Sequence, residues 1–510
     1  MEWLRSAYDA FARVFAAHRL NEGALWHATR DNPSPNIPDG LPLPDTTFRP
    51  GRYLTRYSTF VSGRMFTGEH LVLSEPSADT VFEGLCFDGQ SATQGSYRRW
   101  QLEQASGLFL GASEKVPTSR LRATVRSCVF RDMTGDGIHV RSHTDAQITN
   151  VSMSNCFRGG LSMTAGDVDV LVTNLITRGD IDRTGFDIEL DGGQESATLR
   201  VVNSVLDGDF DVGLRGGSSA EFVNVVTHAP PFNVVARDSR LKCVACRFRV
   251  GMGGTKTNRI IEPHDVVFDD CEFTLTAEDP GGPVAAAANI YWQASPGRRA
   301  TGQRVVFSNC RFRTEGTFPL GSILGAAEEA GAIAVAIGQT GAHEHNTVVV
   351  QGCRIGAGFA RGIHLALGGS LTVQDTVFDS DLALRLYGNR PTGLGFHVIL
   401  DRVDVRRTKT YLMLRTRGDD VLQQRNIVGT AGDNTIRALV RGGARQPSTM
   451  VFIGGRILDG SDGDDAPEGL IGDEWRQFSR DAVSESLCTG MVFTTEEPGV
   501  YQSITWKGLR

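Results

Sequence analysis

The chain has 510 residues, of which 40% are hydrophobic and 22% charged, and this composition excludes a disordered or collagen-like protein. The formal net charge of −7 comes without any strongly basic segment, so we expect no nucleic-acid partner. No apolar run reaches the ~18 to 20 residues of a membrane-spanning helix, and we expect no membrane span.

Residues 1–55 are expected to form a separate attachment or capping segment. Leu4, Tyr8, Phe11 and Phe15 follow a helical spacing, which predicts a short amphipathic helix that either caps the body of the chain or attaches it to a partner. A proline-rich stretch follows, as is typical of an extended linker. Charged residues interrupt every apolar stretch near the N-terminus, so we expect no signal peptide.

A loose repeat runs through residues 56–458. Each copy joins an apolar strand, a turn-forming residue, a cysteine or small aliphatic residue, one polar residue and another apolar residue. The residue after the turn-former falls at positions 128, 156, 175, 205, 225, 246, 271, 310, 353 and 376, so the steps run from 19 to 43 residues. A base period of roughly 20 to 25 residues with loop insertions fits every step.

A second signature lies between these copies, in which a glycine is followed by alternating apolar and polar residues. It begins at Gly137, Gly160, Gly185, Gly213 and Gly362. Each period therefore holds at least two short strands, and a period of this length predicts stacked coils rather than a globular sheet. Propeller blades need about 40 to 50 residues each, so the shorter steps exclude a propeller.

An Asn or Asp recurs at the turn of the repeat, at Asn155, Asn174, Asn203, Asn224, Asp270, Asn309 and Asp375. In this feature, and in the segment Thr80–Gly89, the chain resembles the right-handed parallel β-helix, or pectate-lyase-like, superfamily over residues 60–458. The resemblance implies an all-β fold, a right-handed single-stranded parallel β-helix (solenoid), preceded by the short N-terminal amphipathic helix. It does not imply one activity, because this fold hosts lyases, hydrolases, epimerases and viral adhesins.

The nine cysteines are an odd number and lie far apart, so they do not indicate a disulfide framework. Most of them occupy the inward site after the turn, where a small polarizable side chain packs well. Cys243 and Cys246 lack the second pair of a zinc site, and the loop Asp459–Asp465 lacks the distal glutamate of an EF-hand, so a solvated acidic loop is favoured over a calcium site. We expect no metal and no cofactor.

A polar column on the second strand of the repeat carries the candidate chemistry. The residues two positions after the first four glycines are His139, Ser162, Asp187 and Arg215, and we expect their side chains to share one outer face. Asp187 and Glu189 are two apart on one strand, so their Cα atoms lie about 6.6 to 7 Å apart, which suits the paired carboxyl groups of glycosidases. We predict Asp187, Glu189 and His139 as catalytic residues. An ordinary solvated sheet face is the alternative.

The predicted substrate-binding residues are Asp136, Arg141, Arg158, Arg215, Tyr291 and Trp292. The first four lie on or beside the polar column, where an arginine could bind an anionic sugar. The two aromatic residues fall in expected loop insertions, where solenoids place their binding surfaces. The chain has no Asp-Asp and Gly-His-Gly pairing of polygalacturonase type, and Gly185–Glu189 matches the Asp-Pro-His-Glu run of alginate epimerases in part.

These features favour a virion-associated tailspike or fibre-like protein that binds a host surface polysaccharide. They leave open whether it only binds the polysaccharide or is also a depolymerase, either a glycoside hydrolase or a lyase. A glycan-binding solenoid without an export signal is explained by synthesis in the host cytoplasm and release within a virion. We expect a homotrimer that contacts other virion proteins through its N-terminal region, with residues 459–510 forming a C-terminal cap or oligomerisation segment. The alternatives are a stand-alone polysaccharide lyase, glycoside hydrolase or epimerase, cytoplasmic or secreted, and a purely structural virion protein.

Overall fold

The computed structural model divides the chain into two compact units, Met1–Arg249 (unit 1) and Val250–Arg510 (unit 2). The structure describes residues 25–28, 47–48, 51–55, 71–73, 80–88, 106–111, 120–178 except 134, 142, 157 and 165, 185–190, 196–228 except 209, 232–251, 258–276, 286–292, 302–315, 331–337, 346–365, 369–387, 396–416 except 406 and 409, 421–430, 435–440, 449–458 and 505–506. The expected N-terminal helix and the acidic loop at 459–465 lie outside the described residues.

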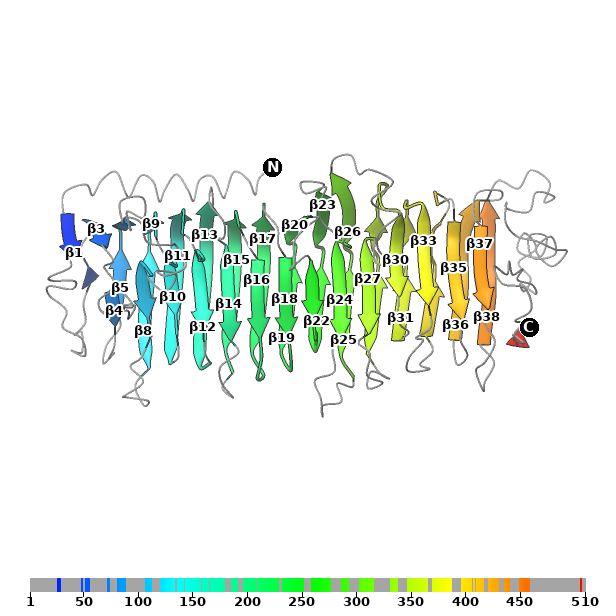
Figure 1. Ribbon diagram of the computed structural model, residues 1–510, viewed down its shortest axis with the longest axis horizontal. Coiled ribbons are helices and arrows are strands. Elements are labelled where there is room, and N and C mark those ends of the chain that lie inside the picture. Colours follow the sequence, from blue (N-terminus) through cyan, green and yellow to red (C-terminus); the bar gives the residue numbers. More distant parts are fainter. Residues whose placement is uncertain are drawn as a thin grey trace, which may run out of the picture. The chain divides into compact units, whose positions relative to one another are not determined.

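Unit 1 consists of strands from two parallel sheets, between which the chain alternates (Figure 1). The first sheet of unit 1 contains β1 (Leu25–Ala28), β2 (Thr47–Phe48), β3 (Gly51–Thr55), β5 (Thr80–Glu83), β6 (Leu85–Asp88), β8 (Leu121–Arg126), β9 (Val129–Arg131), β11 (Thr144–Ser154), β13 (Val168–Arg178), β15 (Thr198–Leu206), β17 (Ser219–Thr227), β19 (Arg240–Val244) and β20 (Arg247–Gly251). The second sheet of unit 1 contains β4 (Leu71–Leu73), β7 (Leu108–Leu110), β10 (Ile138–Val140), β12 (Leu161–Thr164), β14 (Phe186–Leu190), β16 (Phe210–Leu214) and β18 (Phe232–Ala236).

Unit 2 is built in the same way. Its first sheet contains β22 (Asp265–Asp269), β23 (Glu272–Thr276), β25 (Arg304–Ser308), β26 (Arg311–Glu315), β28 (Thr347–Gln351), β29 (Arg354–Ile355), β31 (Gly369–Gln374), β32 (Val377–Phe378), β34 (Phe396–Asp401), β36 (Val421–Thr430), β38 (Thr449–Leu458) and β39 (Thr505–Trp506). Its second sheet contains β21 (Arg259–Ile261), β24 (Ala288–Trp292), β27 (Ile333–Ile337), β30 (Arg361–Leu365), β33 (Leu382–Tyr387), β35 (Thr410–Thr416) and β37 (Thr435–Val440).

Each turn of the chain adds one strand to the second sheet and either one long strand or two short strands to the first, and successive turns pair in parallel. In unit 1, β11 pairs with β13 in the first sheet, while β12 pairs with β14 in the second. The same alternation relates β28 to β31 and β30 to β33 in unit 2. Both units are therefore parallel β-solenoids, which confirms the predicted fold. Right-handed winding, the rule for connections between parallel strands, stays a prediction.

The length of a coil follows the predicted period. Asn150 and Asn174, which are hydrogen-bonded in neighbouring coils, are 24 residues apart, and Asn203 and Asn224 are 21 apart. Loop insertions lengthen the coils of unit 2, where the paired residues Asp265 and Arg304 are 39 apart. Parallel pairing also begins before residue 56, because β3 pairs with β1 and with β6.

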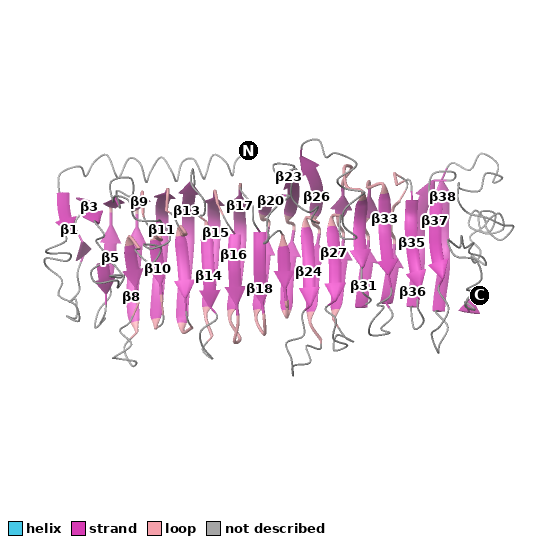
Figure 2. Ribbon diagram, viewed as in Figure 1, coloured by secondary structure: helices cyan, strands magenta, loops and turns pink. Residues whose placement is uncertain are grey.

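Among the described residues every regular element is a strand, as the colours of Figure 2 show. No helix in the part of the chain that the structure describes is long and apolar enough to cross a membrane. Alternation explains why the segments are extended: in β8, Leu121, Ala123 and Val125 are buried whereas Arg122 and Arg126 are exposed. A period of two puts one set of side chains in the core and the other in solvent.

A left-handed backbone bend marks the turn inside the first sheet of each unit. All seven Asn and Asp turn residues of the sequence pattern have a positive φ, between 49° and 55°. Asparagine tolerates this conformation better than other residues with a Cβ atom. Its side chain also continues the stack, since Asn224 Nδ2 donates to Asn203 Oδ1 at 2.8 Å and Asn174 Nδ2 to Asn150 Oδ1 at 2.9 Å.

The residue after the bend points inward, and its side chain bonds to two backbone carbonyls. Cys310 Sγ donates to Ser308 O at 3.3 Å and to Phe268 O of the preceding coil at 3.4 Å, and Thr376 Oγ1 bonds to Gln374 O and Val350 O in the same way. These cysteines are buried and free of disulfides. Their recurrence therefore reflects a small side chain that both packs and satisfies carbonyls at the bend.

The predicted alignment of this inward column is wrong at two coils. Val151 pairs with Leu175, and Ser204 pairs with Val225, so neither Cys156 nor Val205 belongs to the column. Cys156 instead follows a second left-handed bend at Asn155, five residues after the one at Asn150. Two bends with the same local sequence occur in one coil, and sequence similarity alone does not tell them apart.

Candidate active site

A row of polar residues crosses the second sheet of unit 1. The strand register places in one column the residues His139, Ser162, Asp187, Asp211 and Asn233. Their neighbours on each strand, such as Ile138 and Val140, are fully buried in the solenoid core. Because side chains alternate along a strand, the polar column faces away from that core. The strands that carry it, β10, β12, β14, β16 and β18, follow one another in Figure 1.

Arg215 does not lie in this column, contrary to the sequence prediction. Asp211 pairs with Asp187, whereas Gly213 pairs with Glu189 and Arg215 follows the end of β16. The prediction aligned Gly213 with Gly185, but Gly185 precedes its strand while Gly213 lies inside its own. The recurrence of Phe-Asp followed by an aliphatic residue at 186–188 and 210–212 is the signal that could have found Asp211.

Arg158 joins the two carboxyl groups that were predicted to be catalytic. Its Nε donates to Asp187 Oδ2 and its Nη2 to Glu189 Oε2, both at 3.1 Å. The Arg158 side chain is 13% exposed, Asp187 is 20% exposed and Glu189 is 54% exposed. The pair is therefore asymmetric: one carboxyl group is largely withdrawn from water and the other remains in it.

A second, buried group lies behind Arg158. The carboxylate of Asp136 accepts a hydrogen bond from Ser162 Oγ at 2.6 Å and lies 3.3 Å from His139 Nδ1. On its other side His139 forms a hydrogen bond between Nε2 and Thr164 Oγ1 at 2.8 Å. The tautomer of the ring decides which of the two atoms donates. Arg158 Nη1 reaches Asp136 Oδ2 at 4.0 Å, which links this group to the first.

The burial of Asp136 corrects its predicted role in direct substrate binding. Its side chain is fully buried, so it cannot contact a polymer. A buried carboxylate needs charged or hydrogen-bonding partners, and Ser162, His139 and Arg158 supply them. Gly159 makes room for this packing, since a Cβ atom there would lie 2.9 Å from Ser162 Oγ. Asp136 thus supports Ser162, His139 and Arg158 from a buried position.

The environment of Asp187 raises its pKa to about 6 from an ordinary value of 3.8. Burial is the largest cause, and the negative charge of Glu189 adds to it, while Arg158 acts in the opposite direction. Desolvation and like charge both favour the protonated form of a carboxyl group. Near pH 6 Asp187 is therefore able to give a proton, a property that general acids of glycosidases share.

The remaining predicted binding residues have different surroundings. Arg141 follows β10 and is exposed. Trp292, in unit 2, is 1% exposed and donates from Nε1 to Pro263 O at 3.1 Å, so the prediction that it stacks on a sugar is wrong. It lies in strand β24 and not in a loop insertion. Tyr291 precedes it on the same strand, and its side chain lies outside the described part of the structure.

Within the described residues no group of three or more His, Cys, Asp or Glu side chains has the arrangement of a metal site. The sequence reasoning also assigned no role to Thr164 and Ser162, although both lie in the second sheet beside the predicted catalytic residues. Hydroxyl groups at alternate strand positions are common on any sheet surface. Their bonds to His139 and Asp136 distinguish these two, and such bonds depend on register between coils.

No protein-family model matches the chain, and no curated protein matches it. Among solved structures, the chain is similar to the tailspike protein gp49 from Acinetobacter baumannii bacteriophage Fri1, a capsular polysaccharide depolymerase, at 13% sequence identity and a TM-score of 0.25. The similarity covers 86% of this chain and 63% of the tailspike chain, less than two thirds of it. At this TM-score the similarity supports neither a shared site nor a shared activity.

Proposed function

We propose that this protein is a virion-associated, tailspike- or fibre-like protein that binds a host surface polysaccharide and hydrolyses it at the Asp187–Glu189 pair. The observation that supports hydrolysis is the asymmetry of this pair, in which a shielded carboxyl group with a raised pKa lies beside an exposed one. Glycosidases divide the two roles of proton donor and of nucleophile or base in this way. Binding experiments with host polysaccharides would identify the host and the glycan.

In the proposed reaction Asp187 protonates the glycosidic oxygen and Glu189 acts on the sugar carbon. Both accept hydrogen bonds from one edge of the Arg158 guanidinium. Because neighbouring N–H groups of one guanidinium hold both carboxyl groups, we propose the retaining mechanism, which uses the closer carboxyl spacing of about 5 to 5.5 Å. Glu189 is accordingly the nucleophile, and Asp187 returns as the base that activates water in the second step.

His139 has a positioning role in this proposal. It is 5% exposed, which leaves little surface for contact with a polymer. Its bond to Thr164 joins β10 to β12, the strand that pairs with the β14 strand of the acidic pair, and its proximity to Asp136 adds to this support. Arg158 orients the carboxyl groups of Asp187 and Glu189. A substitution of His139 or Arg158 should therefore change the spacing of these two carboxyl groups more than the affinity for the polysaccharide.

Cleavage is tested with a panel of capsular and cell-wall polysaccharides. Reducing ends report hydrolysis, and ultraviolet absorbance of an unsaturated product reports elimination. On the polysaccharide that is cleaved, Asp187→Asn and Glu189→Gln should each lower the rate by ~100-fold or more. Asp169→Asn, which changes an exposed carboxyl group on β13, is the matched control and should retain the rate. Full cleavage by both active-site variants would remove these residues from the mechanism.

Assembly is tested separately by size-exclusion chromatography with light scattering. The tailspike-like arrangement predicts a homotrimer, and resistance of the trimer to SDS would support it. A monomer would contradict the spike while leaving the cleavage site intact, which is the outcome expected for a stand-alone enzyme.

A further inference from the structure

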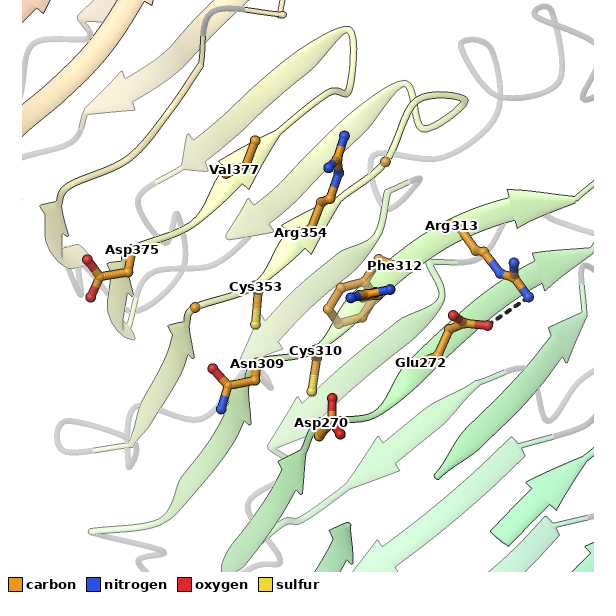
Figure 3. A pocket seen from close by; sticks show the side chains of 13 residues that line it. Asp270, Glu272, Asn309, Cys310, Phe312, Arg313, Cys353, Arg354, Asp375 and Val377 are labelled. Atoms are coloured by element: carbon orange, nitrogen blue, oxygen red, sulfur yellow. Dashed lines mark ion pairs between the residues drawn. The ribbon is translucent and has the colours of Figure 1, made fainter. Parts of the chain in front are cut away.

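Unit 2 carries a groove on its first sheet, remote in sequence from the residues of the acidic pair. It has a volume of about 690 Å³ and is lined by β26, β29 and the ends of the neighbouring strands. Its charged lining residues are Asp270, Glu272, Asp375, Arg311, Arg313 and Arg354, and Asn309 adds an amide. Figure 3 shows the ion pair between Glu272 and Arg313 on one side of the groove and Asp375 on the other.

The groove is hollow where two glycines replace side chains. Gly352 occupies the bend position of its coil with φ 63°, and a Cβ atom there would lie 2.6 Å from Asn309 Oδ1. Gly356 follows β29 and approaches Phe312 O, to which its N–H donates at 2.8 Å. Without side chains at these two points, the arginines of β26 and β29 keep open space beside them.

Arginines of neighbouring coils are aligned in this groove. Arg311 pairs in register with Glu272 on one side and with Arg354 on the other. Neighbouring strands lie about 4.8 Å apart, so the two guanidinium groups can act on one anion. Arg354 is already paired with Asp379 at 2.8 Å, and Glu272 is paired with Arg313 at 2.7 Å.

Arg311 is the exception in this row. Its side chain is exposed, and within the described residues its guanidinium group makes no ion pair. Glu272 is paired with Arg313, and Asp379 is paired with Arg354, so neither carboxylate neutralises Arg311. Three arginines and three acidic residues line the groove, and among these arginines Arg311 is the one that no described carboxylate pairs with, while the carboxylate of Asp270 and the amide of Asn309 line the same groove.

We propose that this groove binds an acidic saccharide, with a carboxylate of the sugar held by Arg311 and Arg354. The planar guanidinium fork suits a carboxylate, and two forks from adjacent coils suit both of its oxygens. The side chains of Asp270 and Asn309 provide an acceptor and a mixed donor and acceptor for sugar hydroxyl groups. A hydroxyl-rich anion uses both kinds of wall, whereas a simple anion would use the arginines alone. The inference does not depend on cleavage by unit 1.

The test uses the full chain with the Asp187→Asn substitution, so that no substrate is degraded. Binding to immobilised polygalacturonate, alginate and hyaluronate is compared with binding to the neutral polymers dextran and amylose. The acidic polymers should be bound at least ~10-fold more tightly than the neutral ones, and Arg311→Gln should lower that affinity by about 10-fold. Arg304→Gln, which changes an exposed arginine on β25 paired with Asp265, is the matched control and should have no effect.

Three outcomes would overturn the inference. The first is the absence of any preference for the acidic polymers over the neutral ones. The second is equal affinity of the Arg311→Gln variant and its parent. The third is binding of inorganic phosphate, lost in Arg311→Gln, without binding of any acidic polymer, which would make the groove a site for small anions. Failure of cleavage in unit 1 would leave all three readouts unchanged, so the two proposals are tested independently.

Discussion

Replacing Asp187 with asparagine should stabilise the protein at neutral pH. The folded-state pKa of Asp187 is about 6 and its ordinary value is 3.8. The folded protein therefore binds this proton more tightly than the unfolded chain does. The stabilisation of the folded state that comes from this tighter proton binding is complete below pH 3.8 and is lost as the pH rises through 6. Above that pH the ionised carboxyl group costs on the order of 3 kcal/mol.

Asparagine does not ionise, so the variant avoids this cost while its side-chain oxygen can still accept from Arg158. A neutral acceptor makes a weaker bond than a carboxylate, which offsets about 1 kcal/mol of the gain. We expect the free energy of unfolding at pH 7.5 to rise by roughly 1 to 3 kcal/mol, or about 2 to 4 °C in Tm for each kcal/mol.

The assay is thermal and urea unfolding of Asp187→Asn and its parent at pH 7.5 and at pH 3.5. The gain should be present at the higher pH and absent at the lower one, where both side chains are neutral. A variant less stable than its parent at pH 7.5 would refute the reasoning, and so would an equal gain at both values. A constant gain would trace to packing and not to charge.

Substitutions at three further positions test other parts of the structure. Asn224→Ala should cost about 2 kcal/mol of stability, because alanine disfavours the left-handed bend and the hydrogen bond to Asn203 is lost. Asn224→Gly should cost less, because glycine adopts the bend. Equal costs of the two variants in urea unfolding would contradict the role of the bend. Cys353→Thr should change stability by less than ~1 kcal/mol, since Thr376 makes the same bonds one coil further on. Cys353→Leu should cost ~1 to 3 kcal/mol by overpacking. If thermal melts show Cys353→Thr to be the less stable of the two variants, Cys353 and Thr376 do not have the same role. Burial, together with two neighbouring arginines, lowers the pKa of His364 well below its usual range, so the unfolded chain binds that proton more tightly and stability falls as the pH drops below about 6.5. His364→Gln should flatten this loss of stability in unfolding curves recorded between pH 7.5 and 5. An unchanged dependence of stability on pH would assign the loss to another group.

The architecture was predictable because its constraints are local. A left-handed bend needs a particular kind of residue, and the next position needs a small side chain, so the pattern survives in the sequence at Asn174, Asn309 and Asp375. Neither requirement depends on what lies in the neighbouring coil. Register between coils does depend on it, and there the prediction misplaced Cys156 and Arg215.

The candidate site was predictable in part for the same reason. Alternation along single strands correctly grouped His139, Ser162 and Asp187. It could not show that Asp136 is fully buried or that Trp292 packs inside, because burial of a residue depends on side chains from other coils. It also could not show that Arg158 joins both carboxyl groups, which requires the reach of a side chain across neighbouring coils.

Burial is what separates the acidic cluster of unit 1 from an ordinary solvated sheet face. On the first sheet, Arg200 and Glu221 form an ion pair at 3.0 Å with side chains 57% and 35% exposed. Exposed pairs of this kind contribute ~0 to 1 kcal/mol and arise on any polar solenoid surface. Arg158 and Asp187 are 13% and 20% exposed, and Asp136 behind them is fully buried. Withdrawing like-charged carboxyl groups from water costs stability, and the fold does not require it, because the outward positions of a coil are free to hold any polar residue. The burial of this cluster therefore supports the proposal that the site is kept for its chemistry.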